Sequence, residues 1–289
     1  MVSSRAERGI LPARFRSLRG RSLAPLGMTA VWFATPTLAA HRVVLAQALS
    51  PPAYSAAQLH CARFAETSHS EIETETAGGS VKATADRRGV WSFRARDSSA
   101  VVVLEGWYDS LSLRRRTGES EVSADTDGLI GGRYRGLLRP AGGYVEIALP
   151  FVPDEVAEVA DLSGVARDLF PPLPPRPLGR GDPWQDAGLK LSRLPDTVVA
   201  RRSLLRFRLE ARGDTREVVP RGDTVPIPVR QTTVEQGDIF WSPTTGLVRR
   251  TRDITTEATV PSGGRIRQPV RSRVVQHVEL TRLPASSCP

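Results

Sequence analysis

Lysine, histidine and cysteine are all scarce in this chain. Only Lys82 and Lys190 are lysines among 40 basic residues, and the 289 residues include two cysteines and four histidines. The histidines are His41, His60, His69 and His277. Their positions follow no metal-ligand spacing, and we find no G-x-S-x-G, phosphate-binding loop or dinucleotide fingerprint. The sequence therefore predicts no metal site, no cofactor and no catalytic residue, and we expect a protein that is not an enzyme.

A hydrophobic run long enough to cross a membrane is also missing. The apolar stretch at 30–40 is short and contains Pro36, whereas a helical span needs about 20 apolar residues. A basic, serine-rich region precedes this stretch and an A-x-A cleavage site follows it, so residues 1–48 look like a secretory leader. Met28 is an alternative start, and an arginine-rich transit peptide is the competing interpretation. We expect an exported protein, periplasmic or associated with the cell envelope, with no transmembrane span in the mature chain.

The basic charge is concentrated in that leader. The whole chain has a formal charge of +9, but residues 1–48 hold seven arginines and one glutamate, which leaves +3 for the remainder. A phosphate-binding surface needs a concentrated basic stripe, and beyond the leader the charges alternate in sign. The sequence therefore predicts no nucleic-acid partner.

Cys61 and Cys288 lie near the two ends of the mature chain. In an oxidising compartment they could form one bridge that closes nearly the whole domain, which the chain-entropy model values at about 4–5 kcal/mol. Two unpaired thiols are the alternative. Lipid attachment is not expected, because it would need a cysteine directly after the leader.

Alternation of apolar and polar residues dominates the mature chain. Trp91, Phe93 and Ala95 share one face of their segment, and the pattern recurs in 144–149, 204–212 and 270–280. Such alternation is typical of an antiparallel sheet with one buried face. We expect a mainly β fold, a curved antiparallel sheet or partial barrel in which two similar β halves are an option. Turn sequences lie at 140–143, 211–214, 243–246 and 261–264.

The segment 154–170 follows a helical period instead, and Pro171 follows it. We expect one amphipathic helix there, bent at Gly164, that covers the open face of the sheet. A short helix is also expected in 55–67. The expected organisation is a leader (1–48), a short helix or linker (49–67), a first β region (68–150), the helix with a proline-rich spacer (151–183), a second β region (184–283) and a tail (284–289).

The tripeptide Arg-Gly-Asp, known from cell-adhesion ligands, occurs at 180–182, 212–214 and 221–223. Glycine and aspartate are preferred turn residues, so we interpret all three copies as turns. The sequence PPLPPR at 171–176 matches a polyproline ligand pattern. A stiff linker explains the same composition, and we prefer that interpretation.

Asp125 and Asp127, in the sequence ADTDG, invite comparison with aspartyl proteases and calcium loops. The glycine that should follow Thr126 is replaced, and no second copy supplies a partner carboxylate. Further oxygen ligands at alternate positions are missing as well. We interpret the segment as an Asx-type turn. An acid-dependent hydrolase that uses Asp125, Asp127 or Asp109 stays as a lesser alternative.

Two longer patterns occur in the second half of the chain. One runs from a Phe-Pro pair to a tryptophan (170–184), and the other links an aromatic pair to a glycine (237–250). With further segments between 107 and 283, they resemble a poorly characterised group of exported, lipoprotein-like, β-rich bacterial proteins of unknown function. The resemblance implies a fold style and a compartment but no activity. The expected structural anchors are Trp107, Phe170, Gly181, Trp184, Trp241 and Gly246.

Taken together, these features favour a non-catalytic exported cell-envelope protein. The expected partner is an apolar or lipid-like ligand held between the sheet and the 154–170 helix, or another envelope protein. A structural or adhesive surface protein is the first alternative, and the hydrolase is the second.

Overall fold

The structure, a computed structural model, describes residues 50–162, 164–186, 188–199, 202–221, 224–262 and 268–284, apart from the side chains of 216–228. All of them belong to one unit, 47–289. The leader at 1–48 and Cys288 lie outside the described residues, so the leader and the Cys61–Cys288 bridge stay predictions.

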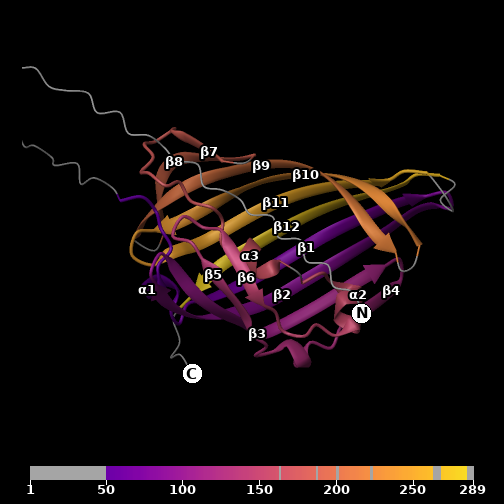
Figure 1. The fold of residues 1–289 in the computed structure, drawn as a ribbon, viewed down its shortest axis with the longest axis horizontal. Coiled ribbons are helices and arrows are strands. Elements are labelled where there is room, and N and C mark those ends of the chain that lie inside the picture. The colour runs from indigo at the N-terminus through magenta and orange to yellow at the C-terminus, as the bar shows by residue number, and fades with distance from the viewer. Residues whose placement is uncertain are drawn as a thin grey trace, which may run out of the picture. The chain divides into compact units, whose positions relative to one another are not determined.

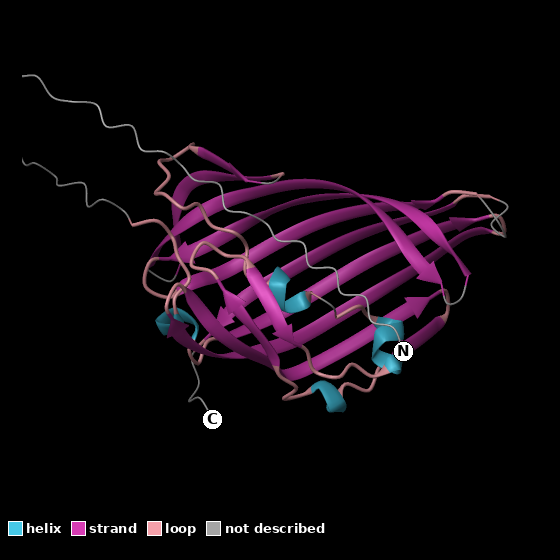
Figure 2. Ribbon diagram, viewed as in Figure 1, coloured by secondary structure: helices cyan, strands magenta, loops and turns pink. Residues whose placement is uncertain are grey.

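The described strands form one open antiparallel sheet (Figure 1), in the order β6-β5-β3-β2-β1-β12-β11-β10-β9-β8-β7, with β4 paired to β3 beside this path. The strands are β1 (Arg63–Thr76), β2 (Gly79–Ser98), β3 (Val101–Thr117), β4 (Ser120–Ser123), β5 (Tyr134–Leu138), β6 (Tyr144–Ala148), β7 (Pro183–Asp186), β8 (Leu189–Val199), β9 (Arg202–Arg221), β10 (Thr224–Ser242), β11 (Gly246–Val260) and β12 (Val270–Leu283). Figure 2 shows that strands dominate and that the long ones bend together. The prediction of a mainly β fold with a curved antiparallel sheet is confirmed.

The first and last strands join the two halves of the sheet. β1 to β6 extend from one side of this junction, and β12 back to β7 extend from the other. β1 pairs with β12 from Arg63 opposite Leu283 to Glu75 opposite Arg271. The two β regions expected from the sequence therefore contribute to one continuous sheet.

Alternation gives this sheet a buried inner face. Trp91, Phe93 and Ala95 of β2 are buried, and so are Phe207 and Leu209 of β9. All five belong to one hydrophobic core. Burying apolar area at roughly 25 cal/mol per Å² is the main favourable term for such a sheet. We call this the inner face, and the opposite side the outer face.

Helices are few and short among the described residues. They are α1 (Ala56–Leu59), the 3₁₀ helix η1 (Asp127–Leu129), α2 (Asp154–Val159) and α3 (Val165–Asp168). The single helix expected at 154–170 is thus two pieces. α2 ends at Val159, because Ala160 is extended with a φ of −149°, and Gly164, with a left-handed φ of +70°, lies at the start of α3.

The helix expected at 55–67 is also shorter than predicted. It ends at Leu59, and β1 begins at Arg63. Residues from Arg63 onward pair with β2 on one side and β12 on the other. Two ladders of backbone hydrogen bonds outweigh a weak local helix preference.

The Arg-Gly-Asp copies do not share one structure. At 180–182 the chain turns: Gly181 has a φ of +84° and donates to the Arg193 carbonyl at 2.7 Å, while the Asp182 carboxylate accepts from the Gly179 amide at 2.8 Å. The turn predicted at 211–214 is wrong, since 212–214 lies inside β9 opposite 232–234 of β10. The β9–β10 hairpin therefore extends past Gly213, where the sequence predicted a turn. The third copy includes Gly222 and Asp223, which lie outside the described residues.

The proline-rich stretch 171–177 is not a free spacer. Leu173 is fully buried, and its amide donates to the Ala141 carbonyl at 2.8 Å. The Tyr54 hydroxyl donates to the Pro171 carbonyl at 3.0 Å. The stretch connects α3 to β7, and an apolar side chain between the prolines fixes it to the core.

Candidate functional site beneath the covering segment

One segment lies across the inner face of the sheet. It comprises α3 and the proline-rich stretch after it, residues 165–178, and we call it the covering segment. Figure 1 shows α3 in front of the long strands. Six of its side chains are buried in the core: Val165, Ala166, Leu169, Phe170, Leu173 and Leu178. The helical region therefore covers the inner face, as the sequence predicted.

Phe170 is the aromatic centre of this cover. Its ring centroid lies 5.5 Å from that of Phe93, 5.6 Å from Tyr54 and 6.1 Å from Tyr144. The first two pairs are edge-on, and such pairs stabilise by about 0.5–1.5 kcal/mol beyond area burial. Phe170 thus fills an aromatic pocket of the sheet with a side chain of the same protein.

A buried carboxylate, Glu66, lies beside this aromatic region. It is 3% exposed and accepts from the Arg87 guanidinium at 2.5 Å, the Trp91 indole at 2.9 Å and the Tyr108 hydroxyl at 3.4 Å. A buried charge is tolerated only when it is paired and hydrogen-bonded. Three donors meet that condition.

A second charged cluster fastens α3 to the sheet. Glu235 accepts from Arg250 at 3.0 Å and from Arg252 at 2.7 and 2.9 Å. Arg252 also lies 3.2 Å from the Asp168 carboxylate, and Arg250 donates to the Asp168 carbonyl. Since the Asp168 carboxylate is more than half exposed, its ion pair with Arg252 is weak.

Burial and pairing act in opposite directions on this cluster. Burial, aided by the neighbouring Arg252, lowers the pKa of Arg250 to about 10. Burial would raise the pKa of Glu235, but hydrogen bonds and charge from Arg252 outweigh it and hold that pKa below its ordinary value. Burial would lower the pKa of Arg252, but Glu235 and Asp168 outweigh it and raise that pKa. All three groups are therefore charged at neutral pH.

A small cavity of about 20 Å³ separates the two clusters. Its lining includes Glu66, Arg87, Asp168 and Arg250. The Nε atoms of Arg87 and Arg250 are buried without a hydrogen-bond partner. A cavity of this size holds about one water molecule. The space under α3 is thus filled by the chain itself, and a larger ligand could enter only if the covering segment moved.

Further along the strands the inner face is less covered. Ile72, Val274 and Ile254 are half-buried there, and so are Thr233 and Thr256. Ile72 lies opposite Val274, and Val274 lies opposite Thr256, so these side chains form a row across three strands. This row lies on the inner face beyond α3, and polar side chains such as Ser70 and Gln276 separate it from the aromatic core.

The expected anchors take several positions. Trp107 stacks against Arg133, whose guanidinium carbon lies 3.8 Å from the ring centroid, and Trp241 packs edge-on against Tyr54. Trp184 is partly buried against the core. Gly246 has a φ of +75° in the β10–β11 turn. Only Phe170 of this set belongs to the covering segment, and the anchor roles stay predictions.

The three aspartates of the hydrolase alternative have separate environments. Asp109 accepts from Arg63, Ser92 and Trp107 at 3.1, 2.5 and 2.9 Å on the outer part of β3. Asp125 accepts from the Asp127 amide at 3.0 Å, which is the Asx-type turn that the sequence predicted. Among the described residues no hydrogen bond or ion pair joins Asp109 to this turn, so we do not propose hydrolysis.

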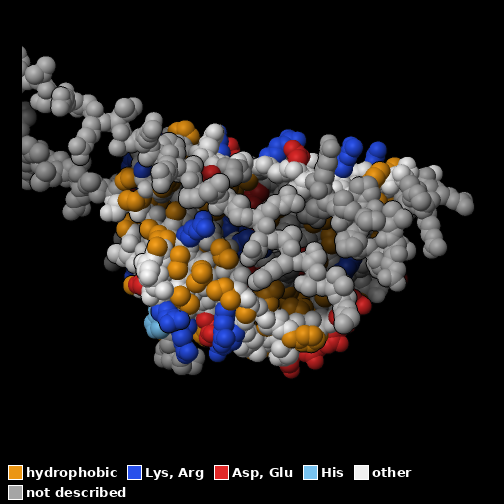
Figure 3. Space-filling model, in the orientation of Figure 1, with side chains coloured by type: hydrophobic (Ala, Val, Ile, Leu, Met, Phe, Trp, Pro, Cys, Tyr) orange, Lys and Arg blue, Asp and Glu red, His pale blue; other side chains and the backbone are white. Residues whose placement is uncertain are grey.

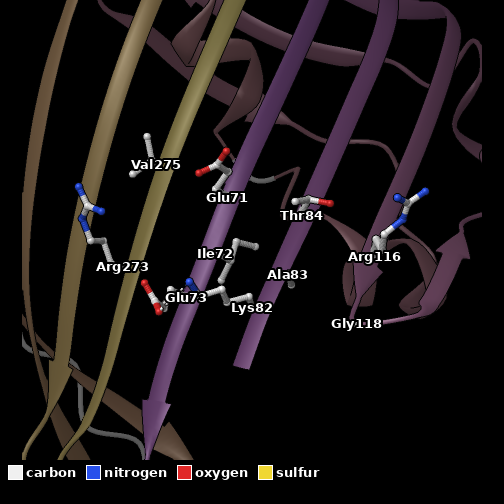
Figure 4. A pocket seen from close by; sticks show the side chains of 10 residues that line it. All are labelled: Glu71, Ile72, Glu73, Lys82, Ala83, Thr84, Arg116, Gly118, Arg273 and Val275. Carbon is white, nitrogen blue, oxygen red and sulfur yellow. Dashed lines mark ion pairs between the residues drawn. The ribbon is translucent and has the colours of Figure 1, made fainter. Parts of the chain in front are cut away.

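The outer face carries a shallow hollow of about 350 Å³ across β12, β1, β2 and β3. Figure 4 shows Glu71, Val275 and Thr84 on neighbouring strands there, with Lys82 and Glu73 forming an ion pair of 3.5 Å. In the part of the chain that the structure describes, no group of three or more His, Cys, Asp and Glu side chains is placed to hold a metal ion.

Apolar side chains are exposed along the sheet edge that adjoins the covering segment. Figure 3 shows hydrophobic side chains gathered over β5 and β6. Val145 and Ile147 of β6 and the following Leu149 and Phe151 are among the exposed ones, with Phe151 82% exposed. Phe170 packs against Tyr144 of the same strand, so apolar surface and cover meet at β6.

Sequence reasoning missed the charged residues of the inner face. Glu66, Arg87, Arg250 and Arg252 were not singled out, since charged residues are almost never fully buried unless they are paired. Their positions in an alternating strand could have indicated an inward direction. Their partners could not be predicted from the sequence, because the two residues of each ion pair lie on different strands.

No helix among the described residues is long and apolar enough to cross a membrane. No family model and no curated protein matches the chain. Three solved structures show some similarity. Neisserial surface protein A (NspA) is 8% identical with a TM-score of 0.22, and the match covers 76% of this chain and 97% of that chain. An outer membrane lipoprotein-sorting protein domain from Vibrio parahaemolyticus is 10% identical with a TM-score of 0.15 (75% of this chain, 83% of that chain), and a DUF1329 family protein from Desulfovibrio piger is 8% identical with a TM-score of 0.14 (75% of this chain, 84% of that chain). Because these TM-scores are low, the proposals below rest on the residues of this chain.

Proposed function

We propose that this protein binds an apolar or lipid-like ligand on the inner face of its sheet, without catalysis, in the cell envelope. The observation that carries the proposal is the covering segment. It places Phe170 and other apolar side chains of the chain itself in an aromatic pocket, where an apolar ligand would make the same contacts.

The attachment of α3 supports a cover that can be displaced. α3 has only four residues and no side-chain cap, and isolated helices this short are not stable on their own. Its polar link to the sheet consists of the half-exposed Asp168 carboxylate and one carbonyl. The ion pair is half exposed on the Asp168 side, and the hydrogen bond from the buried Arg250 is the stronger link. The polar contacts that a ligand must replace are therefore few.

The surroundings of the cover support the same function. Beyond α3, a half-buried row at Ile72, Val274 and Thr256 offers further apolar surface on the inner face. The exposed apolar residues of β6 lie at the edge where such a ligand would enter. Exposed apolar patches mark sites of interaction with ligands, partners or membranes.

The test compares a charged residue on the inner face with one on the outer face. The purified full chain is titrated with a fluorescent fatty acid, and material extracted from the protein with organic solvent is identified by mass spectrometry. We expect Ile254→Asp to weaken probe binding at least about tenfold, because it puts a second carboxylate opposite Glu235 on the half-buried inner face. The matched control Val234→Asp adds the same charge on an exposed outer position of β10 and should bind the probe as the parent does.

An absence of probe binding by the parent chain, together with an empty extract, would count against the proposal. Equal loss in both variants would also contradict it, since the inner face would then have no special role. Far-UV circular dichroism of both variants shows whether the sheet is intact.

A further inference from the structure

Two histidines lie opposite each other on the outer face. β1 and β12 pair in a register that places His69 directly across from His277. Their positions alternate with buried Ser68, Ser70 and Val278, so both imidazoles project from the outer face. Their side chains are 52% and 55% exposed. Directly opposite residues in antiparallel strands have Cβ atoms about 4.5–5.5 Å apart.

Each imidazole contacts an aspartate on the neighbouring strand that lies on the side away from the other histidine. Asp86 of β2 lies 2.9 Å from Nδ1 of His69, and Asp253 of β11 lies 2.7 Å from Nδ1 of His277. The register confirms one row across four strands, with Asp86 opposite His69 and Asp253 opposite His277. A carboxylate at Nδ1 fixes the proton on that nitrogen and leaves the lone pair on Nε2.

The two aspartates lie on the far sides of the histidine pair. Each Nδ1 edge therefore faces outward along the row, and the edge with Nε2 faces the other histidine. Within the described part of the chain neither Nε2 has a hydrogen-bond partner. Carboxylate–histidine pairs of this kind orient imidazoles for metal binding.

We propose that His69 and His277 bind a divalent late first-row transition metal ion through their Nε2 atoms. Imidazole is a preferred ligand of zinc, copper and nickel ions. Two imidazoles supply two positions, water completes the coordination, and Asp86 and Asp253 compensate the charge of the ion. The hollow beside the row, lined by Glu71, Val275 and Thr84 (Figure 4), leaves room for these waters. This site is independent of the ligand-binding function proposed for the inner face.

The test is a Zn²⁺ titration of the full chain at pH 7.5, followed by calorimetry and by the histidine side-chain signals in NMR spectra. We expect one equivalent of Zn²⁺ to bind and to shift the signals of His69 and His277. The double variant H69N/H277N should lose this binding. The matched control H41N/H60N removes the other two histidines and should retain it.

A second variant tests the aspartates. D86N/D253N keeps both imidazoles but removes the carboxylates, and it should bind Zn²⁺ about 10–100-fold more weakly, which is the usual effect of losing such partners. The proposal is overturned if the parent chain takes up no Zn²⁺, or if H69N/H277N binds it as H41N/H60N does. Unfolding midpoints of all variants show that a loss of binding is not a loss of fold.

Discussion

At the scale of single residues, the inner face is unusual for the charges that it buries. Arg250 is 6% exposed and Glu66 is 3% exposed. Taking an ion out of water costs several kcal/mol, and pairing returns that cost only when the geometry is good. The carboxylates of Glu66 and Glu235 each accept more than one hydrogen bond. Glu66 accepts from Arg87, Trp91 and Tyr108, and Glu235 accepts from the guanidinium groups of Arg250 and Arg252.

The lowered pKa of Glu235 predicts how stability depends on pH. A carboxyl group whose folded pKa lies below its unfolded value stabilises the fold above the unfolded value, and this contribution is lost as the pH falls through the folded pKa. We expect Glu235→Gln to reduce the free energy of unfolding at neutral pH by about 1.5–3 kcal/mol. The difference from the parent should shrink as the pH falls below the ordinary value of 4.5.

Urea unfolding at several pH values measures this difference. The matched control is Glu210→Gln, whose ion pair with Lys190 is about half exposed on both sides and should contribute about 0–1 kcal/mol. A Glu235→Gln effect that stays constant down to acidic pH would contradict the prediction.

At the scale of elements, β10 and β11 approach unusually closely beside the charged cluster. Gly237 lies opposite Arg252. A Cβ atom at Gly237 would collide with the Thr251 carbonyl oxygen and lie 3.2 Å from the Arg252 Cα. Both contacts are with backbone, which cannot rotate away. The absence of a side chain here therefore permits the strand spacing that brings Arg252 to Glu235.

We expect Gly237→Ala to destabilise the protein by about 1–3 kcal/mol, as overpacking does in well-packed cores. Gly213→Ala is the matched control, because it is a strand glycine of the neighbouring β9 and a Cβ there meets nothing within 4 Å. Alanine in place of a strand glycine reduces backbone entropy loss, so the control should change stability by less than about 1 kcal/mol. Equal midpoints of thermal unfolding for the two variants would show that the close approach is not tight.

At the scale of the whole sheet, the β1–β12 pairing decides how the two halves behave. These two strands are the centre of the sheet, and each also pairs with its own half. Core side chains from both halves, such as Phe93 and Trp241, belong to the same hydrophobic cluster. Neither half can therefore lose its structure without exposing part of the other.

We expect a single cooperative unfolding transition for the chain. Gly106→Ala in the first half would place a Cβ 2.6 Å from the Phe93 ring, and Gly237→Ala lies in the second half. Both should lower the same midpoint, with coincident curves from tryptophan fluorescence and far-UV circular dichroism. Two separate transitions, one sensitive to each variant, would mean that the halves fold independently.

The sequence determined which residues of a strand are buried, as Trp91, Phe93 and Ala95 show, because the two-residue period is a local property of the extended backbone. It also determined the turns at 140–143 and 243–246 and the helical character of 154–170. The tertiary structure alone decided which strands pair and in which register. For that reason only the fold revealed that Arg250 reaches Glu235, that the proline-rich stretch packs against the core, and that His69 meets His277. Such contacts join residues far apart in the chain, and their energy depends on burial and on a partner that no local pattern specifies.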